Sequence, residues 1–429
     1  MTANISLLDR HKSVLPRWMA LYYEEPIQLA RGEGRTVWDG DGRQYLDFFG
    51  GILTTMTGYG VPEVIEAIRD QAGKMLHSST LYLIESQIEL AEKLAERSGI
   101  PNAKVFFTNS GSEANDAALM LATCYRRSNQ VLAMRHSYHG RSFATVPVTG
   151  NASWATTQLS PFRTHYVHGS YRYRSPFKHL DDAAYTRACV DDLVNILDTA
   201  VAGDVACMIA EPILGVGGFA HGPDGLMGAL HQELAKRGGL FISDEVQTGW
   251  GRTGEHFWGY QAHGFTPDLI TFAKGLGNGL ALGGLIGRAE IIDCFTASSI
   301  STFGGNPLAM RGALANLAYL EAQDLQGNAR AMGALLREGL ADMQRANPAI
   351  GDVRGKGLMI GIELIHSGDG QPDKARARAV LEAAKARGLL IGMGGAYGNC
   401  IRLAPPMSVT GAECREALAI LRACFDQKA

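Results

Sequence analysis

The sequence predicts an α/β fold in which a large domain, built on a mainly parallel sheet flanked by helices, carries a smaller α+β domain. Short apolar runs alternate with helical patterns between positions 104 and 286, and such alternation is typical of parallel strands joined by crossover helices. The pattern changes at Asn306, beyond which two long helices are expected before a mixture of short strands and helices. A chain of 429 residues also exceeds the size of one simple core, so two domains are expected.

The N-terminal segment, residues 1–60, contains short strand signals and is expected to join the smaller domain. Gly34 to Phe48 reads as a β-hairpin, because alternating residues flank the turn sequence Asp39-Gly40-Asp41-Gly42. Two amphipathic helices are then predicted at 61–75 and 85–97, and a glycine and a proline end the second of them.

The large domain is predicted over residues 61–310. Strands are expected in its apolar runs, at 104–108, 130–135, 205–210, 240–243, 269–273 and 282–286. Helices are expected at 112–126, 181–202 and 226–237. The segment 137–179 is rich in polar and aromatic residues and carries no clear pattern of either kind.

The smaller domain is predicted over residues 311–429, after a first long helix that spans the boundary. Helices are expected at 307–322, 326–346, 372–387 and 410–425. Short strands are expected at 351–354, 358–363, 389–392 and 400–403.

The composition narrows the class of protein and its partners. The chain is 46% hydrophobic and 19% charged, as globular proteins are, and its formal net charge of −3 gives no reason to expect nucleic acid or an anionic membrane as a partner. No secretory signal and no run long enough to span a bilayer is expected. Seven scattered cysteines without a CxxC pair indicate reduced thiols in a cytoplasmic protein rather than disulfides or a zinc site.

Two of the predicted strands end in a charged residue. The run from Leu240 closes on Asp244, and the run from Leu269 closes on Lys274. Open α/β sheets bind their ligands at the carboxyl ends of strands. A lysine there can form an imine with an aldehyde cofactor, while a carboxylate keeps the ring nitrogen of that cofactor protonated. The alternative is an ordinary salt bridge between strand ends.

A turn of small residues follows the strand at 104–108 and opens a helix. Ser110, Gly111 and Ser112 stand at this helix start, where free backbone N–H groups and the helix dipole attract an anion. Gly111 lets a phosphate approach the backbone, and the two serines can add hydroxyl donors. The alternative is a plain N-cap made by Ser112. The turn matches neither GxxxxGK[ST] nor GxGxxG, which disfavours NTP and dinucleotide binding.

Two more strand ends carry candidate ligand contacts. Tyr138 and His139 follow the strand at 130–135, so the tyrosine ring can cover a planar cofactor, although a polar surface loop explains the same residues. No acidic or cysteine partner stands at metal-ligand spacing from His139, and no metal is expected. Glu211 ends the strand at 205–210 ahead of a glycine-rich loop, where it either contacts substrate, pairs with an arginine or only orders the loop.

The last two candidates lie towards the C-terminus. Thr302 precedes two glycines and a helix start, a turn that either binds phosphate or simply begins the helix. Arg402 is a charge inside an apolar strand that Pro405 ends, and its guanidinium can hold a carboxylate by two parallel hydrogen bonds. A structural salt bridge, for example to Glu211, is the alternative and is compatible with that role.

Taken together, these stretches resemble the class III aminotransferases, which are pyridoxal-phosphate (PLP) enzymes of fold type I. The family's motifs occur in its order: SGSEAN, YHG, EPxxGxGG, DEVQTGxGRTG, FAKGLGNG, TFGGNP and IRLAPP. The resemblance covers nearly the whole chain, including the early YLDFFGG, and within the family it is greatest to alanine–glyoxylate aminotransferases. One departure is Ser301, where family members usually have histidine, and this puts one contact near the phosphate in doubt.

The resemblance implies PLP as the cofactor and gives each matched residue a role. Lys274 is the Schiff-base lysine and Asp244 the partner of the pyridinium nitrogen. Val246 and Tyr138 would cover the two faces of the ring, and Gln247 would reach its hydroxyl. The implied cofactor-binding set is Ser110, Gly111, Ser112, Tyr138, His139, Asp244, Val246, Gln247, Lys274 and Thr302.

The resemblance also implies a homodimer with shared active sites, because Thr302 of one subunit would bind the phosphate in the other. Arg402 would bind the α-carboxylate of the substrate, and Glu211 would screen Arg402 when an amine without that carboxylate is bound. Leu53 and Tyr82 are expected to line the substrate pocket.

The function expected from these residues is transfer of an amino group from an amine or amino acid to a small 2-keto acid, pyruvate or glyoxylate, in a ping-pong mechanism. A lyase, racemase or decarboxylase is possible on the same lysine and aspartate. Two further classes are a non-catalytic protein of this fold and a nicotinamide-dependent dehydrogenase. The latter is disfavoured because no acidic residue follows the glycine-rich run 275–279 at the required distance.

Overall fold

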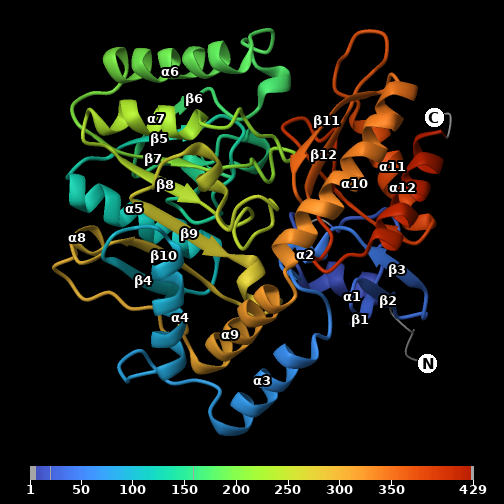
Figure 1. The fold of residues 1–429 in the computed structure, drawn as a ribbon, viewed down its shortest axis with the longest axis horizontal. Helices are drawn as coiled ribbons and strands as arrows, with labels where there is room; N and C mark the ends of the chain where they lie inside the picture. Colours follow the sequence, from blue (N-terminus) through green and yellow to red (C-terminus); the bar gives the residue numbers. More distant parts are fainter. Residues whose placement is uncertain (1–5, 20, 158, 427–429) are drawn as a thin grey trace.

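The computed structural model describes residues 6–19, 21–157 and 159–426. Its centre is a seven-stranded sheet in the order β4-β10-β9-β8-β7-β5-β6 (Figure 1). The strands are β4 (Ala103–Thr108), β5 (Gln130–Met134), β6 (Arg163–Val167), β7 (Val205–Ala210), β8 (Leu240–Asp244), β9 (Leu269–Ala273) and β10 (Gly283–Arg288). From β9 to β6 all neighbours run parallel, whereas β10 is antiparallel to both β4 and β9. The prediction of a mainly parallel sheet is therefore confirmed.

Both faces of this sheet are buried, because alternate residues of each strand enter different cores. Leu132 of β5 packs with α6 (Asp182–Thr199) and α7 (Leu226–Ala235), while Val131 packs with α5 (Gly111–Arg126) and α8 (Ala289–Ile292). Strands covered on both sides must be apolar throughout, which is why β5, β7, β8 and β9 were readable as continuous apolar runs.

Further helices join this domain to the rest of the chain. The helix α3 (Pro62–Lys74) packs on α9 (Pro307–Ala322), and α4 (Glu85–Arg97) packs on both α9 and β4. The helix α9 then leads into α10 (Leu325–Ala346), which packs on β11 (Ile350–Lys356) of the second part of the chain.

The second part holds two four-stranded sheets. One is antiparallel, in the order β11-β12-β15-β14, and uses β12 (Met359–Leu364), β14 (Gly392–Gly394) and β15 (Cys400–Leu403). The other joins β1 (Leu29–Glu33), β2 (Thr36–Asp39) and β3 (Gln44–Asp47) to β13 (Leu389–Leu390). The pairing of β3 with β13 is parallel. The N-terminal hairpin thus shares a sheet with residues near the C-terminus, and α11 (Lys374–Ala386) and α12 (Gly411–Phe425) pack beside them (Figure 1).

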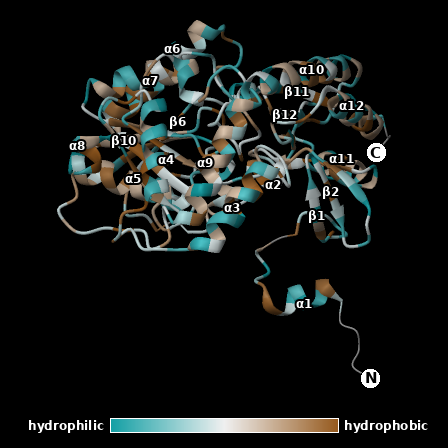
Figure 2. Ribbon diagram, turned by 60° about the horizontal axis from the view of Figure 1, so that its bottom comes forward, coloured by the Kyte–Doolittle hydropathy of each residue, from teal (hydrophilic) through white to brown (hydrophobic). Residues whose placement is uncertain are grey.

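Three elements differ from the sequence-based expectations. The strand β6 lies inside the segment 137–179, and its sequence is polar because β6 is an edge strand with one buried residue. The strand expected at 389–392 is two strands in different sheets, separated at Ile391. A short helix, α1 (Leu7–Val14), precedes the hairpin; none of its residues is buried, and Figure 2 shows it apart from the rest of the chain.

Within the described residues, no helix combines the length and the apolar character needed to cross a bilayer. The same residues contain no cluster of three or more histidine, cysteine, aspartate and glutamate side chains arranged to hold a metal ion.

Candidate active site

Asp244 and Lys274 lie at the carboxyl ends of neighbouring parallel strands, β8 and β9. Asp244 is opposite Thr271 in this pairing, and Lys274 directly follows the end of β9. The backbone of Lys274 has a φ of 48°, a left-handed conformation that a long side chain rarely adopts and that is concentrated at functional sites. The chain therefore turns sharply at the lysine, at the sheet edge where ligands bind.

Asp244 is buried and held by three donors. Its Oδ2 accepts a hydrogen bond from Asn115 Nδ2 at 2.7 Å, and Nδ1 of His139 lies 2.8 Å from the same atom. Its Oδ1 accepts from the backbone N–H of Val246 at 3.1 Å. Three fixed partners orient the carboxylate and leave it few alternative positions.

Asn115 was not identified as a site residue from the sequence. Its side chain donates to Asp244 and to the carbonyl of His139 at 2.8 Å, and it accepts from Thr271 Oγ1 at 2.6 Å. Two features of the sequence could have indicated its role: an amide side chain near the start of α5 and a hydroxyl inside the apolar strand β9. Buried polar groups need hydrogen-bond partners, and these two bond to each other.

His139 is expected to bind cofactor, and the structure places it against Asp244 instead of in the open part of the site. Its Nδ1 faces Asp244, while its buried Nε2 has no hydrogen-bond partner among the described residues. The ring therefore acts on the site through Asp244.

The start of α5 is a capped helix start, with a different serine as the cap from the one expected. Ser110, and not Ser112, is the N-cap, because its side chain accepts from the N–H of Glu113 at 3.2 Å. Ser112 Oγ accepts from the backbone N–H of Arg141 at 3.2 Å. A Cβ on Gly111 would lie 2.9 Å from Val246. This glycine is therefore required for close packing of the helix start on Val246, two residues after Asp244.

Gln247 and Tyr138 both lie next to the segment from Glu211 to Gly215. The Oε1 of Gln247 is buried without a hydrogen-bond partner among the described residues. Tyr138 donates its N–H to Glu211 Oε1 at 2.8 Å, and its ring meets Trp154 edge-on with centroids 5.3 Å apart. Trp154 was not found from the sequence, because it lies in a segment without regular pattern.

Lys274 is buried among charged side chains that affect the pKa of its amine. Burial lowers the pKa of the Lys274 amine, the negative charges of Asp244 and Glu211 oppose that shift, and the positive charge of Arg402 adds to it. Lowering the pKa of an amine increases its neutral fraction at a given pH. Lys274 is thus closer than an exposed lysine to a form that can accept a proton.

Glu211 orders its loop through backbone N–H groups. Its Oε1 accepts from Tyr138 and its Oε2 from Gly215, both at 2.8 Å. Burial is the main cause that raises the pKa of Glu211 to about 7; the charge of Asp244 acts in the same direction and that of His139 against it.

The raised pKa of Glu211 predicts a pH-dependent stability. A carboxyl group with a higher pKa in the folded state stabilises it fully below the unfolded pKa, and this contribution is lost as the pH rises through 7. The Glu211→Gln variant should therefore gain about 2 kcal/mol relative to wild type between about pH 5.5 and pH 8. Urea unfolding at the two pH values measures the gain, whereas a difference independent of pH would contradict it.

Arg402 corrects one expectation. No ion pair joins Arg402 to Glu211 among the described residues; instead Arg402 Nη1 donates to the carbonyl of Gly215 at 3.1 Å and Nη2 to that of Met393 at 3.0 Å. The N–H of Gly215 donates to Glu211 Oε2. The backbone of Gly215 therefore lies between the two side chains, and it forms one hydrogen bond with each of them.

The guanidinium of Arg402 also lies over two aromatic rings. It lies 4.9 Å from the ring centroid of Phe49 and 5.5 Å from that of Phe219, distances at which cation–π attraction operates. Leu53 is buried in a small apolar cluster that includes Phe219, which brings it to the same place. The Nε atom of Arg402 has no partner among the described residues.

Tyr82 and Thr302 are not enclosed with the other site residues. Tyr82 is 71% exposed, and Thr302 is exposed beside Ser301. Ser301 connects this turn to the start of α5, because its Oγ accepts from Asn109 Nδ2 at 3.2 Å. One chain alone therefore leaves both side chains at the surface.

Comparison with known proteins identifies the family. The model of a family described as Aminotransferase class-III matches residues 20–425. This chain belongs to the class III aminotransferases. It is 37% identical to Alanine–glyoxylate aminotransferase 2 homolog 2, mitochondrial, of Arabidopsis thaliana, over 94% of this chain and 84% of the relative. The resemblance to alanine–glyoxylate aminotransferases is thereby confirmed.

Two solved structures extend the comparison. One is an amine transaminase from an uncultivated Pseudomonas species in the PLP-bound form, with a TM-score of 0.89, 30% identity and coverage of 94% of this chain and 95% of that one. The other is a phospholyase from Arthrobacter in complex with phosphoethanolamine, with a TM-score of 0.91, 29% identity and coverage of 99% and 100%. The chain has fold type I, and as a class III aminotransferase it is a PLP-dependent transaminase.

The residues of the site suit PLP. Gln247 Oε1 is a buried acceptor without a partner among the described residues, as the ring hydroxyl of PLP needs. Asp244 supplies a buried carboxylate and Lys274 an amine with a lowered pKa. The absence of a side chain at Gly111 keeps the start of α5 against Val246. The acceptor, the carboxylate and the amine are the chemical groups that the cofactor's ring hydroxyl, ring nitrogen and aldehyde require.

Proposed function

We propose that this aminotransferase moves an amino group from an amine or amino acid to a small 2-keto acid, pyruvate or glyoxylate, in a ping-pong mechanism. The observation that carries the proposal is the pair at the ends of β8 and β9, where Asp244 is fixed by three donors and Lys274 has a lowered pKa. Similarity to an alanine–glyoxylate aminotransferase supports the choice of keto acid.

The bound cofactor supplies an electron sink for the carbanion that amino transfer requires. Asp244 would accept a hydrogen bond from the protonated ring nitrogen, and its three protein partners keep its oxygens in place. Val246 and Tyr138 would pack on the ring, Gln247 would accept a hydrogen bond from the ring hydroxyl, and the start of α5 would hold the phosphate. The Nζ of Lys274 removes a proton from the substrate carbon and would return it to the cofactor carbon.

Arg402 binds the α-carboxylate of the substrate. Its guanidinium is oriented by the carbonyls of Gly215 and Met393 and lies close to the rings of Phe49 and Phe219. Glu211, separated from Arg402 by Gly215, screens this charge when the donor has no carboxylate. Leu53 closes the apolar side of the pocket, and the exposed Tyr82 is assigned to the pocket of a second subunit.

The Arg402→Ala variant is expected to raise the KM for the keto acid by about 10²-fold, because a bidentate charge-assisted contact is lost. The affinity for PLP should change much less. Arg402→Lys is the matched control, since it keeps the charge but not the planar guanidinium. Its KM for the keto acid should lie between those of the wild type and Arg402→Ala. Steady-state kinetics and PLP titration separate the effects, and equal loss of both would contradict the assignment.

An absorbance titration tests the function itself. The PLP-loaded protein is mixed with L-alanine, β-alanine, 4-aminobutyrate, L-ornithine or an arylalkylamine, and then with pyruvate or glyoxylate. Loss of the visible cofactor band with one donor, and its return with a keto acid, demonstrate both half reactions. A band that persists with every donor would contradict amino transfer.

A second candidate function is elimination by a PLP-dependent lyase. The observation that favours it is the structural similarity to the phospholyase from Arthrobacter over the whole of both chains. Adding phosphoethanolamine to the donor panel distinguishes the two. A lyase releases inorganic phosphate without a keto acid, whereas a transaminase needs the keto acid for turnover.

We also propose that the enzyme is a homodimer with shared sites. The exposed Tyr82 and Thr302, which the single chain leaves outside the site, would then complete the site of the partner subunit. Free cysteines throughout the chain support a reducing, cytoplasmic location.

Mixed dimers test the sharing of sites. Lys274→Ala homodimers should be inactive, and Thr302→Ala homodimers should bind PLP about tenfold or more weakly through loss of a phosphate hydrogen bond. In a hybrid dimer, one site combines the intact Lys274 of one chain with the intact Thr302 of the other. Refolded mixtures should therefore recover activity at a low PLP concentration at which neither parent is active. No recovery in a verified hybrid would place Thr302 in its own chain's site.

A further inference from the structure

The two accessible cysteines of the chain lie at one place. Cys124 is exposed in the last turn of α5, and Cys294 is partly buried just beyond α8, whereas the other five cysteines are buried. Cys294 Sγ is 3.7 Å from the carbonyl oxygen of Leu121, one helical turn before Cys124. Because a helical side chain leans back over the preceding turn, this contact places the two thiols next to each other.

Cys124 also acts on Cys294 electrostatically. Burial raises the pKa of Cys294, and the charge of Cys124 raises it further. The two residues belong to segments far apart in the sequence, so their approach is produced by the packing of α5 against α8.

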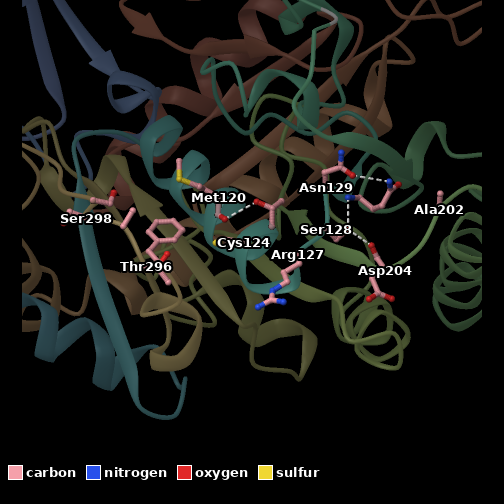
Figure 3. A pocket seen from close by; sticks show the side chains of 14 residues that line it. Met120, Cys124, Arg127, Ser128, Asn129, Ala202, Asp204, Thr296 and Ser298 are labelled. Carbon is pink, nitrogen blue, oxygen red and sulfur yellow. Dashed lines mark hydrogen bonds between the residues drawn. The ribbon is translucent and has the colours of Figure 1, made fainter.

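Cys124 opens onto a surface cavity of about 960 Å³. Figure 3 shows it on the wall that α5 forms, between Met120 and Arg127, with Thr296 and Ser298 on another part of the lining. In the single chain, a small oxidant in solvent can therefore reach the exposed Cys124 directly, whereas Cys294 is partly buried.

We propose that Cys124 and Cys294 are a redox-sensitive dithiol that forms a reversible intramolecular disulfide when the protein meets a hydroperoxide. The thiolate of Cys124 attacks the peroxide, whose O–O bond breaks, and becomes a sulfenic acid as hydroxide leaves. The sulfur of Cys294 then attacks the sulfenic sulfur; the S–S bond forms, the S–O bond breaks, and the oxygen leaves as water with the proton of Cys294. With hydrogen peroxide, two thiols are oxidised and one peroxide is reduced to two waters. An added dithiol reverses the reaction by exchange.

The disulfide would tie the end of α5 to the segment that leads from Cys294 to Ser301. Residues 296–300 of this segment are exposed and, at Ser301, reach the turn bonded to Asn109. A crosslink between positions so distant in the sequence strongly restrains the unfolded chain and is expected to stabilise the protein. It also restrains the exposed segment in the folded state.

The test uses the full-length, PLP-loaded enzyme, reduced and then treated with hydrogen peroxide at a small excess. Non-reducing peptide mapping should find Cys124 linked to Cys294 in one chain, with two free thiols lost. The thermal midpoint should rise by several degrees, hydrogen exchange in residues 296–300 should slow, and dithiothreitol should reverse all three changes.

Variants separate the steps. Cys124→Ser should give no crosslink, and Cys294→Ser should stop at a sulfenic acid on Cys124 that dimedone traps. Cys189→Ala, which removes a buried thiol, is the control and should crosslink as wild type does. A disulfide between the Cys124 residues of two chains, or overoxidation of Cys124 beside a free Cys294, would overturn the proposal.

Discussion

The Lys274→Ala variant is expected to lower kcat by about 10⁴-fold, the upper range for removal of a general acid–base group. Lys274 directly follows β9, and burial beside Asp244, Glu211 and Arg402 lowers the pKa of its amine. The charged side chains that act on Lys274 are Asp244, Glu211 and Arg402, so the described part of the chain offers no neighbouring lysine as a substitute. The affinity for PLP should fall far less than the rate.

The size and shape of the lost side chain can be separated from its proton transfer. Lys274→Arg keeps a cation but cannot be deprotonated near neutral pH, so it should be nearly as inactive as the alanine variant. A small primary amine added to Lys274→Ala should restore part of the half-reaction rate, and the restored rate should follow the pKa of the added amine. Stopped-flow absorbance measures this rescue. A rate insensitive to every amine, in a variant that still binds PLP, would show that Lys274 does not move the proton.

Much of the large domain was predictable because its central strands are buried on both faces. The apolar runs of β7, β8 and β9 predicted buried strands, and the carboxyl ends of these runs marked Glu211, Asp244 and Lys274 as candidate site residues. The edge strand β6 was missed for the opposite reason, since only Val167 of its five residues is buried and the sequence of the others is set by solvent.

Other misses come from tertiary packing that no local pattern records. Leu389–Leu390 pairs with β3, whereas Gly392–Gly394 pairs with β15. At Gly392 a Cβ would lie 2.2 Å from the ring of Phe49. The apolar run is continuous in sequence, but its partners come from two different sheets.

The site residues also divide into those that local sequence predicted and those that only tertiary packing brings together. Strand-end position and residue type were sufficient to single out Asp244 and Lys274. The link through Asn115 depends on how α5 is placed against Thr271 of β9, and the separation of Arg402 from Glu211 depends on the path of the loop at Gly215. Both are properties of the folded chain and not of any single motif.

The Asp244→Asn variant is expected to lower the rate of both half reactions by about 10³-fold, because a preorganised charge that stabilises the transition state is removed. The substitution keeps the shape of the side chain, and its amide oxygen can still accept from Asn115 Nδ2, which lies 2.7 Å from Oδ2 in the wild type. The thermal midpoint and the affinity for PLP should therefore change little compared with the rate.

A cofactor analogue decides whether the missing charge is the cause. PLP methylated at the ring nitrogen carries a permanent positive charge there and needs no carboxylate to remain cationic. It should restore a large part of the half-reaction rate in Asp244→Asn while giving no gain in the wild type, as measured by stopped-flow absorbance. Asn115→Ser is the matched control, because it leaves the charge of Asp244 but removes one donor; its smaller loss should not be rescued by the analogue. If Asp244→Asn reconstituted with the analogue stays as slow as with PLP, Asp244 acts by holding the geometry of His139 and Val246 and not by its charge on the ring nitrogen.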